Sequence, residues 1–112
     1  MKDNEFFKTM SKKTTLTDGE QKAFCAWEKG ISKNENFPLL VDFFGLWTRE
    51  IKDFLETIKK SGLKKFGFFS TSTQDCQYIV AFIENGWKIA GTFEFDRTPF
   101  EKAKGLIFEF SD

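Results

Sequence analysis

The stretch KFGFFSTSTQDCQYIVAFIENGWKIAGTFEF, residues 65–95, decides the fold. It begins with a short apolar run, Lys65–Ser70, that is typical of a largely buried strand. A cluster of hydroxyl side chains at the end of this run favours a helix start, and the helix is expected from about Gln74 to Asn85. Residues 87–96 then alternate between apolar and polar side chains, and this period of two predicts a second strand.

Toward the C-terminus, the sequence predicts a polar connection at Arg97–Gly105 and a third strand at Leu106–Phe110, with Leu106, Phe108 and Phe110 inward. The last two strands are expected to form an antiparallel hairpin. The inward face of the first hairpin strand is predicted to carry Trp87, Ile89, Phe93 and Phe95. The inner face of the preceding helix is predicted to carry Cys76, Ile79, Val80 and Ile83.

Toward the N-terminus, the pattern changes to helical. Residues 17–20 read Thr-Asp-Gly-Glu, which fits a capping box, and this helix is expected to end at Gly30. A longer helix is predicted from Pro38 to Lys60, because its apolar residues follow one stripe of period 3.6. Gly45 either kinks this helix or splits it so that Thr48 caps a second piece. Phe6, Phe7 and Met10 fit a short first helix, but the order of residues 1–16 is left open.

These elements predict one α+β domain, residues 1–112, with N-terminal helices followed by a β-α-β-β unit and a small three-stranded sheet. A chain of 112 residues is of ordinary size for a single domain.

The amino-acid composition excludes several kinds of catalytic and metal-binding site. The chain has no histidine, which excludes Ser-His-Asp and Cys-His catalysis and histidine-ligated metals. We therefore expect a non-enzymatic protein without metal or cofactor. Its net charge of zero disfavours a nucleic-acid coat. No apolar run approaches the length of a membrane span, and the N-terminus lacks a secretory signal, so a cytoplasmic protein is expected. Cys25 and Cys76 are expected to be reduced core residues, and a single disulfide or a reactive thiol is the alternative.

One candidate site is the predicted helix start after the first strand. Exposed amides at a helix N-terminus, surrounded by hydroxyl groups, can bind phosphate or carboxylate. The same residues also suit an ordinary helix cap, and the segment lacks the glycines of a phosphate-binding loop. The anion-site hypothesis names Thr71, Ser72, Thr73 and Gln74.

The other candidate is a protein-binding surface. Residues 66–112 carry four basic and seven acidic side chains, and 18% of all residues are aromatic, more than a core of this size usually holds. Four phenylalanines, Phe37, Phe69, Phe82 and Phe100, do not follow the predicted inward patterns. An exposed aromatic patch or a homodimer interface is therefore an alternative that the sequence leaves open. The residues predicted to contact a partner are Glu94, Asp96, Glu101, Glu109, Phe69 and Phe100.

Two resemblances follow from quoted motifs. The runs DFLETIKKSGLKKFGFF (residues 53–69) and NGWKIAGTFEFDR (residues 85–97) resemble a small uncharacterised family of bacterial plasmid and phage proteins over about residues 38–112. The same region is similar in shape to the C-terminal half of the GNAT acyltransferase fold, and the run AFIENGWKIAGTFEF (residues 81–95) stands where that fold has a helix, a turn and a hairpin. The segment NFPLLVDFFGLW (residues 36–47) departs from that family, because it lacks the glycine-rich loop that holds the CoA pyrophosphate.

The sequence therefore favours a small protein-binding or regulatory protein of a phage or plasmid, acting as an inhibitor of a host defence protein. The first alternative is a degenerate GNAT-like domain that binds a small ligand or acyl-CoA. The second alternative is a nucleic-acid-binding module that uses the lysines of residues 59–65.

Overall fold

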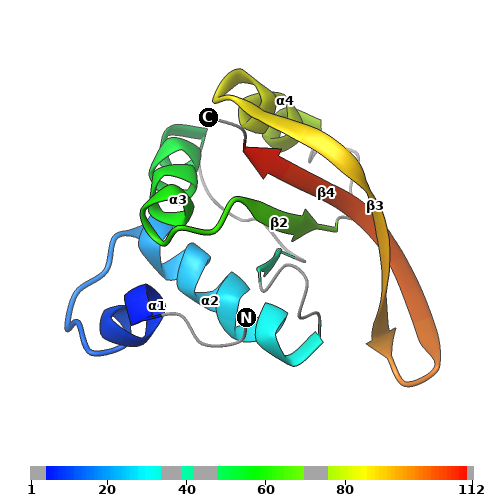
Figure 1. Cartoon of the computed structure of the whole chain (residues 1–112), viewed down its shortest axis with the longest axis horizontal. Helices are drawn as coiled ribbons and strands as arrows, with labels where there is room; N and C mark the ends of the chain where they lie inside the picture. Colours follow the sequence, from blue (N-terminus) through cyan, green and yellow to red (C-terminus); the bar gives the residue numbers. More distant parts are fainter. Residues whose placement is uncertain (1–4, 34–38, 42–47, 70–75, 111–112) are drawn as a thin grey trace.

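The computed structural model describes residues 5–33, 39–41, 48–69 and 76–110, and shows an α+β fold with N-terminal helices (Figure 1). The elements follow the chain in the order α1 (Glu5–Met10), α2 (Asp18–Lys33), β1 (Leu40–Val41), α3 (Thr48–Lys60), β2 (Lys65–Phe68), α4 (Cys76–Glu84), β3 (Trp87–Thr98) and β4 (Glu101–Phe110).

In the described part of the chain, the sheet has four strands in the order β1-β2-β4-β3, so the expectation of three strands was wrong. β1 runs parallel to β2. The predicted antiparallel hairpin is confirmed, and β4 lies between β2 and β3. The additional strand is β1, whose two residues pair with Gly67 and Phe68.

β1 replaces the first part of the helix that was predicted from Pro38. Leu39, Leu40 and Val41 are all buried, and consecutive buried residues suit a strand covered on both faces. Leu39 and Val41 pack into the main core, while Leu40 packs on the opposite face of the sheet. α3 begins at Thr48, which agrees with the alternative that the long helix is split there.

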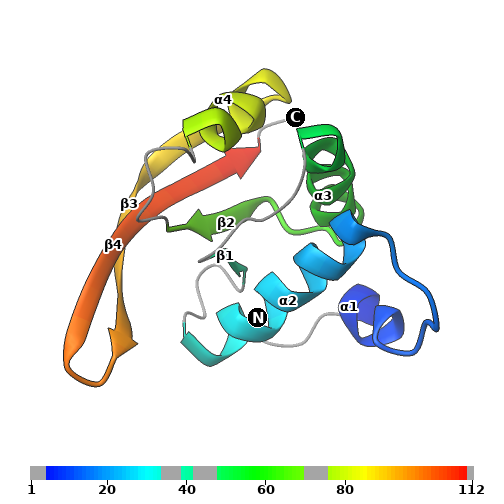
Figure 2. The same cartoon turned by 180° about the vertical axis from the view of Figure 1, so that it is seen from behind.

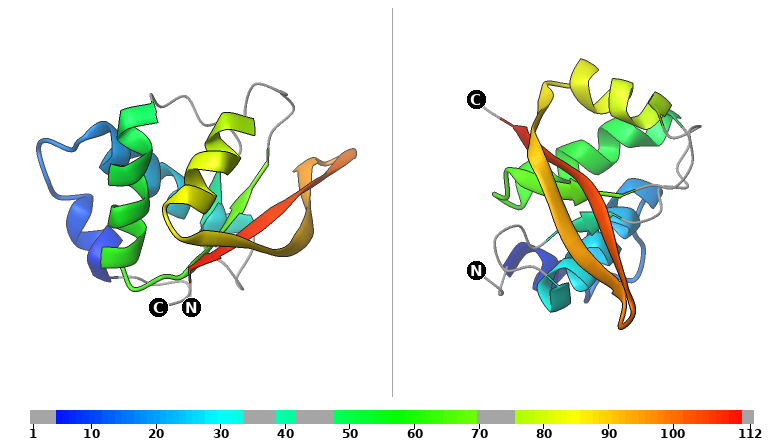
Figure 3. Two further views of the ribbon diagram at one scale, coloured as in Figure 1. Left: turned by 90° about the horizontal axis from the view of Figure 1, so that it is seen from above. Right: turned by 90° about the vertical axis from the view of Figure 1, so that its right-hand side faces the viewer.

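The main core lies where α3 and α4 cover one face of the sheet, and Figure 3 shows both helices on the same side of the hairpin. The ring of Phe82 contacts those of Phe66, Phe68 and Phe108, with centroid distances of 5.1, 5.4 and 5.0 Å. The predicted inner face of α4 was therefore wrong except at Ile79, which packs against the main core. Phe82 was expected off the inward pattern but is fully buried, whereas Val80 and Ile83 are exposed.

A β-bulge explains why the inward pattern of β3 was also wrong. The register of β3 against β4 shifts between Ile89 and Gly91, so Ala90 is an extra residue. Because side chains alternate along a strand, one extra residue moves all later side chains to the other face. Trp87 stays in the main core, while Phe95 joins a second cluster on the opposite face.

The hairpin is much longer than the sequence predicted, because residues 97–105 were expected to form a polar connection. Thr98 pairs with Glu101, so only Pro99 and Phe100 lie between the strands. β2 pairs with β4 only from Leu106 to Glu109. Residues 93–105, which we call the arm, extend beyond this pairing as a two-stranded ribbon (Figures 1 and 2).

The N-terminal helices complete the core. The predicted capping box is present: the Glu20 amide donates to Thr17 Oγ1 at 3.1 Å, and the Thr17 amide donates to Glu20 Oε1 at 3.0 Å. α2 passes through Gly30 to Lys33 instead of ending there, and Gly30 is not among the glycines with positive φ. The helix ends expected at Lys60 and at about Asn85 agree with the structure, where α3 ends at Lys60 and α4 at Glu84. Each end is followed by a glycine with positive φ, Gly62 at 87° and Gly86 at 94°.

Candidate protein-interaction surface

The tip of the arm presents one aromatic side chain to solvent. Phe100 is 98% exposed, the largest exposure among the large apolar residues that the structure describes. The Phe100 amide donates a hydrogen bond to Thr98 Oγ1 at 3.2 Å. Pro99 fixes its own φ near the value that a turn requires at this position. The backbone that carries the exposed ring is therefore constrained locally.

The arm face on the helix side carries a ladder of charges. Glu94 lies opposite Lys104, and Asp96 lies opposite Lys102. Residues directly opposite in an antiparallel pair share a face at about 5 Å between their Cβ atoms. A polar hollow of about 250 Å³ is lined by Glu94, Phe95, Asp96 and Lys102. The predicted partner residues Glu94 and Asp96 therefore lie in a surface that alternates between acidic and basic side chains.

The other arm face is apolar and ties the arm to the sheet. Phe95 and Ala103 are buried with Leu40, and Phe69 and Phe93 pack against them. The Phe95 ring contacts the Phe69 ring at 5.3 Å and the Phe93 ring at 5.6 Å between centroids. These contacts hold the apolar face of the arm against β1 and against Phe69, which follows β2.

The structure brings only part of the predicted partner surface together. Glu94, Asp96, Glu101 and Phe100 all lie on the arm. Glu109 instead lies in the paired part of β4, opposite Lys65 of β2 and Lys88 of β3. Phe69 is half-buried and packs against the second cluster.

Other predictions fall partly outside the described part of the chain. The proposed anion site, Thr71, Ser72, Thr73 and Gln74, lies outside the described residues, as does Phe37. Cys25 and Cys76 are free thiols, but both are exposed, so their predicted place in the core was wrong. Cys25 lies on the outer side of α2, and Cys76 is the first residue of α4.

Sequence reasoning named the acidic residues and Phe100 of the arm but missed its other residues. Lys102 and Lys104 were assigned to a connection, although they alternate with Ala103 and Gly105 as strand residues do. Pro99 was the available signal for a tight turn, because proline favours the first central position of a turn.

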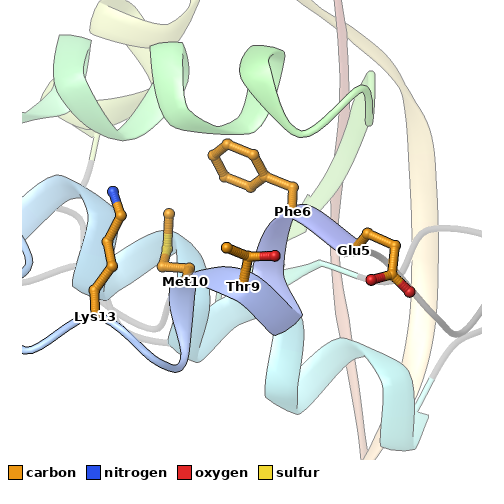
Figure 4. A pocket seen from close by; sticks show the side chains of 5 residues that line it. All are labelled: Glu5, Phe6, Thr9, Met10 and Lys13. Carbon is orange, nitrogen blue, oxygen red and sulfur yellow. The ribbon is translucent and has the colours of Figure 1, made fainter.

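A second hollow lies beside α1 and is lined by Glu5, Phe6, Thr9, Met10 and Lys13, with a volume of about 290 Å³ (Figure 4). The ring of Phe6 points toward α3 in this view, and Phe6 and Met10 belong to the main core or its margin. The two charged residues are engaged, Lys13 with Glu20 at 3.4 Å and Glu5 with Lys8 at 3.9 Å. We assign this hollow to the packing of α1.

Within residues 5–33, 39–41, 48–69 and 76–110, no helix is long and apolar enough to cross a bilayer. In the same described residues, no group of three or more acidic or cysteine side chains is arranged to hold a metal ion.

These features define a small α+β domain with a projecting two-stranded arm. Residues 22–104 match the sequence profile of a domain of unknown function, DUF7698. Because the match covers more than half of the sequence, the chain belongs to this family. No curated protein and no solved structure matches the chain.

Proposed function

We propose that this protein is a non-catalytic binding module that recognises another protein through the tip of its arm, with Phe100 as the anchoring side chain. The observation that carries the proposal is the 98% exposure of Phe100 at a turn stabilised by its own Thr98 hydrogen bond. Inhibition of a host defence protein by a small phage or plasmid protein, the role that the sequence favours, is part of this proposal.

The energetics favour an interaction role for this side chain. Burying a phenylalanine in a partner contributes about 1.5–3 kcal/mol. Ordering a mobile side chain or loop on binding costs free energy, so a constrained turn retains more of that contribution. Aromatic anchors seated in a pocket of the partner are typical of the residues that dominate protein interfaces.

The experiment is site-specific crosslinking. A photoreactive phenylalanine analogue is placed at position 100 of the tagged full chain, and a matched chain carries it at the exposed position Glu28 of α2. The proposal expects one protein to crosslink from position 100 alone, and the two purified proteins to form a complex of fixed stoichiometry. Crosslinking from both positions alike, or from neither, would refute it.

A second candidate is the binding of a small ligand or acyl-CoA, and one observation favours it. β1 and β2 run parallel and are connected through α3, and in sheets with such connections ligands commonly bind beyond the carboxyl ends of the strands. Binding to the native state raises the melting temperature. An increase with millimolar CoA, but not with an equal concentration of sulfate, would support this candidate, and unchanged melting would remove it.

A further inference from the structure

We propose that the outer edge of β3 between its two bulges accepts an extended segment of the partner protein that carries basic side chains at alternate positions. This inference deepens the proposed function, since it describes how the partner would contact the arm beside the tip. The segment would add a fifth strand to the sheet next to residues 91–96.

The sheet order places β3 at an edge. Among the described strands, β3 pairs only with β4, so no described strand lies along its other side. A strand of 12 residues is long for a sheet edge, and long edges are a template for strand addition.

The bulges limit where a segment can add. The register shifts between Ile89 and Gly91 and again between Asp96 and Thr98. Bulges bend a strand and interrupt regular pairing. The regular stretch between them is Gly91–Asp96, which is long enough for a short ladder of backbone hydrogen bonds.

The side chains of this stretch define the chemistry of the partner. Thr92, Glu94 and Asp96 are exposed on the helix-side face in the outermost row of the sheet, and Lys102 and Lys104 occupy the next row inward. A new strand would place its side chains opposite the outermost row. Opposite charges in directly facing positions stabilise a strand pair, and like charges destabilise it. Basic residues two positions apart therefore complement Glu94 and Asp96.

The same row disfavours a second copy of this chain. Full antiparallel overlap of residues 92–96 with their copies would place Glu94 opposite Glu94. A shift by one pair in one direction would place Glu94 opposite Asp96. Both arrangements set acid against acid in the outermost row, so a homodimer paired in either of these two registers is not expected at this edge.

The test uses two blocked seven-residue peptides, one of alternating lysine and valine and one of alternating glutamate and valine, added at millimolar concentration to the isotope-labelled full chain. We expect the lysine peptide to shift the amide signals of residues 91–96 and to slow the exchange of alternate amides there, and the glutamate peptide to do neither. Equal responses to the two peptides, a response confined to other residues, or no response along β3 would overturn the inference.

The double variant Glu94→Gln with Asp96→Asn should lower the affinity for the lysine peptide about fivefold, because two favourable cross-strand pairs are lost. The control Glu5→Gln with Glu28→Gln removes the same charge from exposed helix positions and should leave the affinity unchanged. In the unmodified chain, raising the salt concentration should lower the affinity for the lysine peptide, because salt screens interactions between solvent-exposed charges. Equal weakening in both double variants would overturn the pairing with β3.

This result is separable from that of the crosslinking. A partner that crosslinks at position 100 while the peptides leave β3 unchanged would refute strand addition alone. Strand addition without crosslinking at position 100 would refute the anchoring role of Phe100 alone.

Discussion

The rings of Phe69 and Phe95 meet edge to face at 5.3 Å, and this contact joins the end of β2 to the arm. Phe95 pairs with Ala103 of β4, and the pairing of β2 with β4 ends at Leu106. Phe95 therefore lies in the arm, beyond the part of the hairpin that β2 pairs with. The contact therefore supports a segment that backbone hydrogen bonds to β2 do not reach. It also explains why Phe69, which was predicted to face a partner, is half-buried against the second cluster.

Removing this contact should loosen the arm without unfolding the domain. In Phe69→Ala, we expect amide hydrogen exchange to accelerate in residues 93–105, because the arm loses its edge-to-face support. Exchange in α3, which packs in the separate main core, should change little. The measurement is exchange followed by mass spectrometry, and uniform acceleration in α3 and the arm would contradict the assignment.

The approach of α2 to α3 at Gly19 allows a second prediction. A Cβ atom at this position would lie 2.7 Å from the Phe54 amide nitrogen and 2.9 Å from Asp53 Cβ. Because the backbone of α3 would have to shift, Gly19→Ala should lower the free energy of unfolding by about 1–3 kcal/mol, despite the higher helix propensity of alanine. Chemical denaturation measures this loss.

The control is Glu28→Ala, at an exposed position of the same helix, which should stay within about 0.5 kcal/mol of the parent. A stable Gly19→Ala variant would show that the two helices are not in close contact there.

The capping box predicts a pH dependence of stability. The hydrogen bond from the Thr17 amide, with a smaller contribution from the charge of Lys13, lowers the pKa of Glu20 below its ordinary value of 4.5. A carboxyl group with a lowered pKa in the folded state stabilises the fold above the unfolded-state pKa. This contribution is lost as the pH falls below about 4.5 and through the folded-state pKa.

Glu20→Gln should therefore be less stable than the parent by about 0.5–1 kcal/mol at pH 7, and the difference should shrink as the pH falls toward 3. Unfolding curves at pH 7, 5, 4 and 3 measure it, with Glu28→Gln as the exposed control. A difference that stays constant over this range would contradict the role of the ionised carboxylate.

The fold could be predicted from the sequence where a single hydrophobic period continued without interruption. The stripe of Ile51, Phe54, Leu55 and Ile58 predicted a buried helix face, and all four side chains are buried in α3. The capping box at Thr17 and the turn at Gly86 have local causes, so they were predicted as well.

Sequence reasoning failed where one residue changed the phase or where pairing was distant. The extra Ala90 reverses the faces of β3, and nothing in the local alternation signals it. β1 is a strand of only two residues and exists through its pairing with Gly67 and Phe68, which lie far along the chain. The arm was missed for a related reason, because Lys102 and Lys104 form strand pairs with acids of β3.

The anchoring role of Phe100 is tested most directly by the affinity of Phe100→Ser for the protein that crosslinks at position 100. The account predicts binding weaker by about 10- to 100-fold, with a free energy of unfolding within about 0.5 kcal/mol of the parent, because the ring is exposed in the unbound protein. Unchanged affinity in this variant would contradict the account.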